Sequence, residues 1–512
     1  MISYPLKTPY IKNGKPRFPF HPRVNTLFFI FAISAISTIL FWEIGSVRAA
    51  EDKSENKSAS YSLISKRVSG TVDQVERKID VQGKLIFEVD VETGESTAKA
   101  AGDDSLSAAA AKNPPRNAKK REQKIPMHVS GIQTYEEMLV TRGNLLQGEK
   151  ALPTLGVWAF LKDEVKITVD KDEQSQTLNP NGLLFGLNIH DAKINYFRPG
   201  DLLTREEKDL LDQQGNTLLV DFLLPNRKVK IGESWNQPPE LMGLMLQLEM
   251  VYQMEVTTTL EEVKNNTAIL KTAGWIEGSS DGTASKIELT GQTYFHIPSG
   301  RITWNGLIIK ETRSAGHVAP GMEVTARLQY TIKPLAKSEK LTEETVSKIV
   351  FEDSQAARLL CLDPGGVWRC EMDARWFATS YNPESATFRM VDKGDLIAQC
   401  TITTSPSTQS PPDITLNTFQ DEIKKSLQGT IEAVADSSQI ETEDGTKIYR
   451  VEFTGKVDDL PLNWTAYRIY KPAVAKKSVA RQIMLIFTVE EKLVEAFQLA
   501  DQTIIQTFQW EK

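Results

Sequence analysis

The feature that most restricts the fold of this chain is an alternation of apolar and polar residues between Met250 and Ile332. It is strict in the stretches beginning at Met250, Ala284 and Glu323, and less regular in two segments between them. Turn-forming residues separate these stretches, namely Asn265-Asn266, Asp281-Gly282 and Pro298-Ser299-Gly300. The pattern predicts an antiparallel meander with one apolar face and one solvated face. Several stretches are long enough that we expect the sheet to curve.

The apolar face of this sheet needs a cover. Each large apolar side chain left in water forfeits about 1.5–3 kcal/mol, so a dozen of them would undo a domain. The segment from Pro238 to Leu248 predicts a covering helix, because proline stands at its start and large apolar residues follow. A second helix is predicted to begin at Thr204, where Glu207 completes a capping box.

Two interpretations of the first helix remain open. Its side chains either complete the core or, together with the strand that follows, line a cavity for a lipid or another apolar ligand. The candidate lining residues are Leu241, Met242, Leu244, Met245, Leu248, Met250, Tyr252 and Met254.

The region after residue 340 has a different pattern. A charged connector, predicted to be helical, occupies residues 341–358, and the C-terminal domain covers residues 359–512. Short strand patterns alternate there with two amphipathic helical patterns, beginning at Leu416 and Glu490. We therefore predict an α+β protein: a curved, helix-covered β-rich domain over residues 51–340, followed by an α/β/α sandwich with a mostly antiparallel sheet.

An Ala-, Ser- and Pro-rich tract at residues 96–126 interrupts the first domain. Such a composition cannot bury a core and predicts a disordered insertion in a long loop. It contains the basic patch that begins at Arg116, which is interpreted as a solvated linker.

The N-terminus indicates export. Five basic residues and no acidic one precede an apolar run at residues 27–42, and Val47 and Ala49 suit a cleavage site. The run lies between the about 7–15 residues of a signal peptide and the about 20 of a membrane-spanning helix. We favour a cleaved signal over a retained transmembrane helix as anchor. Either way, the remaining chain faces outward, and only residues 27–42 would contact a membrane.

Charge argues against nucleic acid as a partner. The net charge is −7, and removing residues 1–49, with six basic residues and one acidic residue, leaves −12. An acidic exported protein has no general electrostatic attraction to phosphate backbones.

The chain has three cysteines, so at most one intrachain disulfide can form. Cys361 and Cys370 are the candidate pair, bridging a hairpin whose turn contains Asp363. The alternative is that Cys361, Cys370 and Cys400 are small buried apolar residues.

No catalytic or cofactor motif emerges from the sequence. Gly278–Gly282 matches the nucleophile elbow, but a strand rather than a helix follows, so Ser280 is assigned to a turn. The histidines lack metal-binding spacing, and there is no phosphate loop or dinucleotide fingerprint. Paired acids such as Glu136-Glu137 and Glu206-Glu207 are interpreted as solvated charges. We therefore predict no enzyme activity and no cofactor.

Several stretches carry a resemblance to known proteins. The segments "LLPNRKVKIGESW", "GRITWNGLIIKETRSAGHVAPGMEV" and "LPLNWTAYRIY" resemble a family of large exported bacterial proteins of unassigned function, from about Tyr61 to Lys512. In the order of its elements, the C-terminal part is similar to the PsbP-like α/β/α sandwich. That similarity implies a binding module and supplies no catalytic residue.

Three functional classes follow. The first is an exported, non-catalytic binding or scaffolding protein with an unknown protein partner, which we favour. The second is a carrier of an apolar small molecule. The third is a hydrolase whose active site is dispersed along the sequence.

Overall fold

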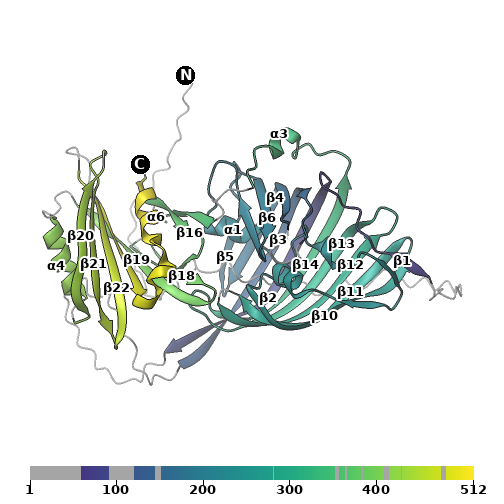
Figure 1. The fold of residues 1–512 in the computed structure, drawn as a ribbon, viewed down its shortest axis with the longest axis horizontal. Helices are drawn as coiled ribbons and strands as arrows, with labels where there is room; N and C mark the ends of the chain where they lie inside the picture. The colour runs from purple at the N-terminus through teal and green to yellow at the C-terminus, as the bar shows by residue number, and fades with distance from the viewer. Residues whose placement is uncertain are drawn as a thin grey trace, which may run out of the picture.

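The computed structural model contains two large antiparallel sheets with a small sheet between them (Figure 1). It describes residues 59–90, 120–144, 152–280, 282–351, 357–363, 366–382, 384–408, 414–427, 429–473 and 480–511. The export segment at residues 1–50 lies outside the described residues. So do residues 96–119 of the predicted insertion, whereas residues 120–126 belong to a strand of the first sheet.

The first sheet, called the large sheet below, has twelve strands. Its order is β7-β6-β4-β3-β2-β14-β13-β12-β11-β10-β9, and β5 pairs with β4. The strands are β2 (Val72–Asp90), β3 (Lys120–Thr141), β4 (Thr154–Val169), β5 (Asp172–Gln176), β6 (Leu184–His190), β7 (Lys193–Phe197), β9 (Ser234–Asn236), β10 (Met250–Lys264), β11 (Thr267–Ser280), β12 (Thr283–His296), β13 (Arg301–Arg313) and β14 (Gly321–Leu335). A two-stranded sheet of β1 (Ser60–Ser62) and β8 (Lys228–Lys230) accompanies it.

One face of the large sheet carries the core. Alternate residues of its strands point to that face, and short helices pack against it: α1 (Arg205–Leu211), η3 (Val220–Leu223) and α2 (Pro239–Leu246). The capping box predicted for α1 is present, because the Thr204 side chain accepts from the Glu207 backbone and the Glu207 side chain accepts in return. The other face is left to solvent over most of β2, β3 and β11–β14.

The C-terminal part is built around a second sheet of seven strands, ordered β17-β18-β19-β23-β22-β21-β20. These are β17 (Trp376–Tyr381), β18 (Ser385–Asp392), β19 (Asp395–Thr408), β20 (Ile431–Glu441), β21 (Lys447–Val457), β22 (Leu460–Lys471) and β23 (Ala480–Glu490). Helix α4 (Leu416–Ser426) packs on one face. The other face packs against η5 (Glu491–Leu493), α5 (Val494–Phe497), α6 (Ala500–Thr507) and the small sheet of β15 (Arg358–Leu362), β16 (Trp368–Asp373) and β24 (Gln509–Trp510).

The predicted α+β class is wrong, because the described residues are mainly β and the longest helix, α4, has 11 residues. The predicted α/β/α sandwich is also wrong. The final helical pattern breaks where Gln498 and Leu499 adopt left-handed backbone angles, which leaves α5 with four residues and α6 with eight. Residues 358–373 then form β15 and β16, so the small sheet occupies much of the space that a helical layer would need.

The two large sheets are joined through α1 and β15. The Leu360 amide donates to the Leu203 carbonyl at 2.9 Å, and Leu359 belongs to the core of the large sheet. The Arg205 guanidinium donates to the Trp376 carbonyl at 2.9 Å and lies over the Phe377 ring at 4.3 Å. Within the predicted connector, α3 (Glu343–Val346) is the helical segment among the described residues, and residues 352–356 lie outside them.

The expectation of a transmembrane helix is corrected for the described part of the chain. None of its helices is both long and apolar enough to cross a bilayer. The apolar run at residues 27–42, which prompted that expectation, lies outside the described residues.

Candidate binding site

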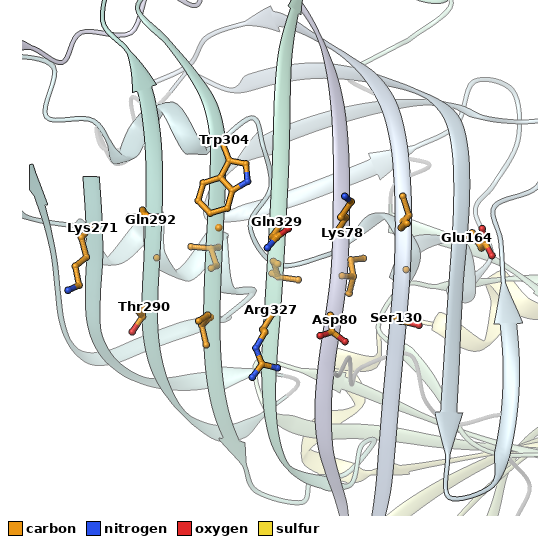
Figure 2. A pocket seen from close by; sticks show the side chains of 18 of the residues that line it. Lys78, Asp80, Ser130, Glu164, Lys271, Thr290, Gln292, Trp304, Arg327 and Gln329 are labelled. Atoms are coloured by element: carbon orange, nitrogen blue, oxygen red, sulfur yellow. The ribbon is translucent and has the colours of Figure 1, made fainter. Parts of the chain in front are cut away.

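The exposed face of the large sheet carries an open pocket of about 950 Å³. Side chains from β2, β3, β4 and β10–β14 line it, so it extends across the centre of the sheet (Figure 2). A second, shallower hollow of about 790 Å³ adjoins it on the same sheet and shares Arg327. Residues far apart in the sequence therefore meet at this face through strand pairing alone.

Strand register arranges the lining residues in two parallel rows. Each row crosses the strands at right angles, because paired residues of neighbouring antiparallel strands face each other directly. The first row is Lys271, Gln292, Gly306, Gln329, Lys78, Ile132 and Glu164. The second row is Thr290, Ile308, Arg327, Asp80, Ser130 and Lys166. With strands about 4.8 Å apart, the first row extends over roughly 29 Å.

An aromatic ring lies at the middle of the first row. Trp304 pairs with Tyr294 on the exposed face of β13, just before a β-bulge shifts the pairing between β12 and β13 at Tyr294/Phe295. The Trp304 ring covers Gly306, where a Cβ atom would come within 2.3 Å of the ring. Gly306 is therefore the residue that lets the indole lie against the sheet. The Tyr294 ring lies beside it, with 4.9 Å between ring centroids.

Planar amide groups flank this ring. Gln292 and Gln329 are the register partners of Gly306 on its two sides, and Figure 2 shows Gln292 and Gln329 on the strands next to Trp304. The Tyr294 hydroxyl donates to Gln292 Oε1 at 3.3 Å. Each amide offers two donor hydrogens and an acceptor oxygen, so the ring is bordered by groups that bind hydroxyls.

Charges of both signs surround the rows. Three lysines have acidic partners at the edge of the pocket or beyond it: Lys78 with Glu76 at 3.1 Å, Lys271 with Glu261 at 3.3 Å and Lys166 with Glu173 at 3.3 Å. His128 Nε2 lies 3.7 Å from Asp80 Oδ1. Among the described residues, none forms an ion pair or hydrogen bond with the Arg327 guanidinium. Arg327 is thus a cation at the centre of the face, directly opposite Asp80 in the strand register.

The opposite, buried face contains a cluster of charged groups. Arg67 contacts Glu137 at 2.5 Å and Asp73 at 3.0 Å, and Arg301 contacts Asp73 at 2.5 Å. Asp221 lies 3.6 Å from Arg67. Burial lowers the pKa of Arg67, but the three carboxylates outweigh it and raise that pKa overall. Burial raises the pKa of Asp73, and both guanidinium groups oppose this.

This cluster corrects the interpretation of the paired acids. Glu137 is 0% exposed and accepts from the Trp158 indole at 2.6 Å, and Glu136 and Glu207 are buried as well. Of the four acids, Glu206 is exposed. Glu207 pairs with Arg198, and Glu136 accepts from Ser338. The Arg67 cluster itself holds the N-terminal segment, β2, β3 and β13 together.

Of the eight predicted apolar-ligand residues, six lie in or against one core and two are exposed. Leu241, Met242, Leu244, Met245 and Leu248 are buried in the core of the large sheet. Met250 and Tyr252 are 54% and 59% exposed, and Met254 is half-buried. The reason is a register shift between Val251 and Gln253, which turns Val251 toward the core in place of its neighbours.

The remaining candidates from the sequence are Ser280, a metal site and the cysteine pair. Ser280 ends β11 and β12 begins at Thr283, so strands lie on both sides of the former elbow motif. Among the described residues, no three His, Cys, Asp or Glu side chains gather as a metal site. Cys361 and Cys370 are directly paired on β15 and β16, and they are unbonded in this structure.

Comparisons with known proteins assign no family. No protein-family model matches the chain, and neither does any protein of curated function. Acinetobacter baumannii OccAB1 is 8% identical, with 84% of this chain and 99% of that chain covered and a TM-score of 0.11. Pseudomonas aeruginosa OccK10 (OpdN) is 8% identical, with 82% and 98% covered and a TM-score of 0.09. Pseudomonas aeruginosa OccK8 (OprE) is 10% identical, with 82% and 97% covered and a TM-score of 0.09. TM-scores of this size carry no argument about fold or function.

Sequence reasoning missed the pocket because it treated the polar face of the sheet as merely solvated. A signal was present, since Trp304, Ile308 and Ile132 are large apolar residues at positions that the alternation assigns to water. Ile308 and Ile132 are 43% and 38% exposed. Clustering of such residues marks a surface that binds something.

Proposed function

We propose that this is an exported, non-catalytic binding protein and that the exposed face of its large sheet binds a glycan chain. The observation that carries the proposal is the Trp304 ring lying over Gly306, with Gln292 and Gln329 on its two sides. A sugar ring has an apolar face of C–H bonds and an equatorial rim of hydroxyls. An aromatic surface bordered by amides complements both parts.

The dimensions of the site favour a chain over a single sugar. The pocket is open, and the first row crosses seven strands, a length of roughly 29 Å. A linear glycan lying across the strands would meet the aromatic ring at the centre and polar side chains on either side. The row runs from the donor Lys271 at one end to the acceptor Glu164 at the other, with the amides of Gln292 and Gln329 between them.

Export is supported by the basic and apolar pattern of residues 1–49, and cell-surface glycans would be available to a protein outside the cytoplasm.

Affinity electrophoresis of the folded protein in gels containing soluble polysaccharides, neutral or uronate-bearing, tests the proposal. We expect at least one polysaccharide to retard the protein, and Trp304→Ala to remove the retardation. Trp275→Ala is the matched control, because Trp275 lies on the same sheet and is 39% exposed but does not line the pocket. A Trp304→Ala protein that migrates like the parent in every polysaccharide gel contradicts the proposal.

A further inference from the structure

We propose that Cys361 and Cys370 form a disulfide in the exported protein, and that this bond fastens the large sheet to the C-terminal sheet. The site lies apart from the exposed face discussed above, so it does not depend on glycan binding. Three independent observations support the proposal: the register of the two cysteines, the different anchoring of their strands, and the enclosure of the third cysteine.

The register meets the geometric requirement for a disulfide. Cys361 on β15 and Cys370 on β16 are direct partners in an antiparallel pair. Such partners have Cα atoms about 4.5–5.5 Å apart, within the about 4.4–6.8 Å that disulfides span. The side chains of direct partners project from the same face of a sheet.

The two strands are anchored in different parts of the protein. On β15, Leu359 belongs to the core of the large sheet and Leu360 forms a parallel bridge with Thr204 just before α1, whereas Cys361 packs against the core of the C-terminal sheet. On β16, Trp368, Cys370 and Met372 belong to the core of the C-terminal sheet. A bond between Cys361 and Cys370 therefore pins β15, which reaches the large sheet through Leu359 and Leu360, to β16, in addition to the short turn and the strand pairing that already join the two strands.

The chemistry assigns distinct roles to the two thiols. Cys361 is partly exposed, so its thiolate can attack a disulfide oxidant such as oxidised glutathione, releasing one reduced glutathione. The Cys370 thiol then displaces the second glutathione from the mixed disulfide. Two protein thiols are oxidised and two glutathione thiols are formed, so electrons and protons balance. Hydrogen bonding from Cys361 and burial raise the pKa of Cys370, so Cys361 is the thiol that attacks the oxidant first.

Cys400 is an internal control. It lies on β19 between Phe388 and Phe487, its register partners on the neighbouring strands, and it is fully buried. Burial raises the pKa of its thiol. We therefore expect Cys400 to stay reduced while the other two cysteines are oxidised.

Counting free thiols by mass spectrometry tests the pairing. The folded, full chain is incubated with oxidised glutathione, quenched in acid, denatured and alkylated. We expect one alkyl label, on Cys400, and three after reduction. The Cys400→Ser variant should carry no label before reduction and two after it. The Cys361→Ser variant should lack the intramolecular disulfide. Three labels on the oxidised parent, or a tryptic peptide joining Cys400 to another cysteine, would overturn the proposal.

Calorimetry tests the fastening. The oxidised protein should unfold with its two sheets coupled, at a Tm at least about 3 °C above that of the reduced protein, whose units should separate into two transitions. The Cys361→Ser variant should behave like the reduced protein under both conditions. If the labels show the disulfide but the oxidised and reduced proteins melt identically, the bond forms without fastening the sheets, and that part of the proposal fails.

Discussion

Replacing Asp209 by asparagine should stabilise the protein, and the gain should grow with pH. Asp209 lies on α1, is 2% exposed, and receives no hydrogen bond at Oδ1 from any described residue. Burial raises the pKa of Asp209 to about 8, although Arg205 and Lys208 oppose this. The carboxyl group is therefore mostly neutral in the folded protein at pH 7, whereas in the unfolded chain it is ionised.

The direction in which stability changes with pH follows from proton binding. Between pH 3.8, the ordinary pKa of this group, and pH 8, the folded state holds a proton that the unfolded state has released. Stability must then fall as pH rises, by at most about 1.4 kcal/mol per pH unit. Asparagine has the same shape and does not titrate. The gain should be near zero below pH 4, reach about 4 kcal/mol at pH 7 as an upper limit, and level off above pH 8.

Urea unfolding of the parent and Asp209→Asn proteins at half-unit steps from pH 4.5 to 8.5 measures this difference. Glu240→Gln is the control, because Glu240 is an exposed acid in the first turn of another helix, α2. Its effect on the free energy of unfolding should stay below about 0.5 kcal/mol. A gain for Asp209→Asn that is constant across this range, or that shrinks as pH rises, would refute the assignment of a neutral buried carboxyl group.

Three further predictions follow. Glu137→Gln should lower the free energy of unfolding by about 3–5 kcal/mol, because it removes a buried partner of Arg67. The exposed control Glu164→Gln should change that free energy by less than about 0.5 kcal/mol, and urea unfolding measures both values. By the same measurement, Met245→Ala should lower the free energy of unfolding by about 2–5 kcal/mol, and Met250→Ala should lower it by less than about 0.5 kcal/mol. Equal decreases would mean that both side chains share one environment, which would contradict the prediction. Native mass spectrometry of the protein recovered from an export-competent host should show the mass of the chain without a lipid, because α2 side chains are packed into the core; an added mass that vanishes on denaturation would contradict this placement.

Local patterns predicted much of the large sheet. Strands β10–β14 follow the alternation of their residues, and α1 and α2 begin near the predicted capping signals. The incorrect predictions arose where a local change at one or two residues shifts the strand register or breaks a helix. The shift at Val251/Gln253 exposes Met250 and Tyr252, and the left-handed pair Gln498-Leu499 breaks a helix. Neither position carries a distinctive residue such as glycine or proline.

Features that depend on long-range pairing could not be predicted in this way. Arg301 meets Asp73 across 228 residues, and Arg67 meets Glu137 across 70. In a strand pattern, a charged residue indicates a solvent-exposed position unless its buried partner is known. The rows of the candidate site have the same origin, since Gln292, Gly306, Gln329 and Lys78 become neighbours through register, which the alternation alone does not determine.

The pairing of β2 with β14 has a consequence for how the protein is made. Val72 lies opposite Leu335, so the long strand β2 gains its second neighbour from residues about 250 positions later in the chain. A chain that emerges from its N-terminus first exposes one full edge of β2 until β14 has emerged as well. Open strand edges pair readily with other chains. The protein should therefore be most vulnerable to aggregation when it is partly translocated, and a chaperone that shields strand edges should raise its yield more than one that acts on the finished fold.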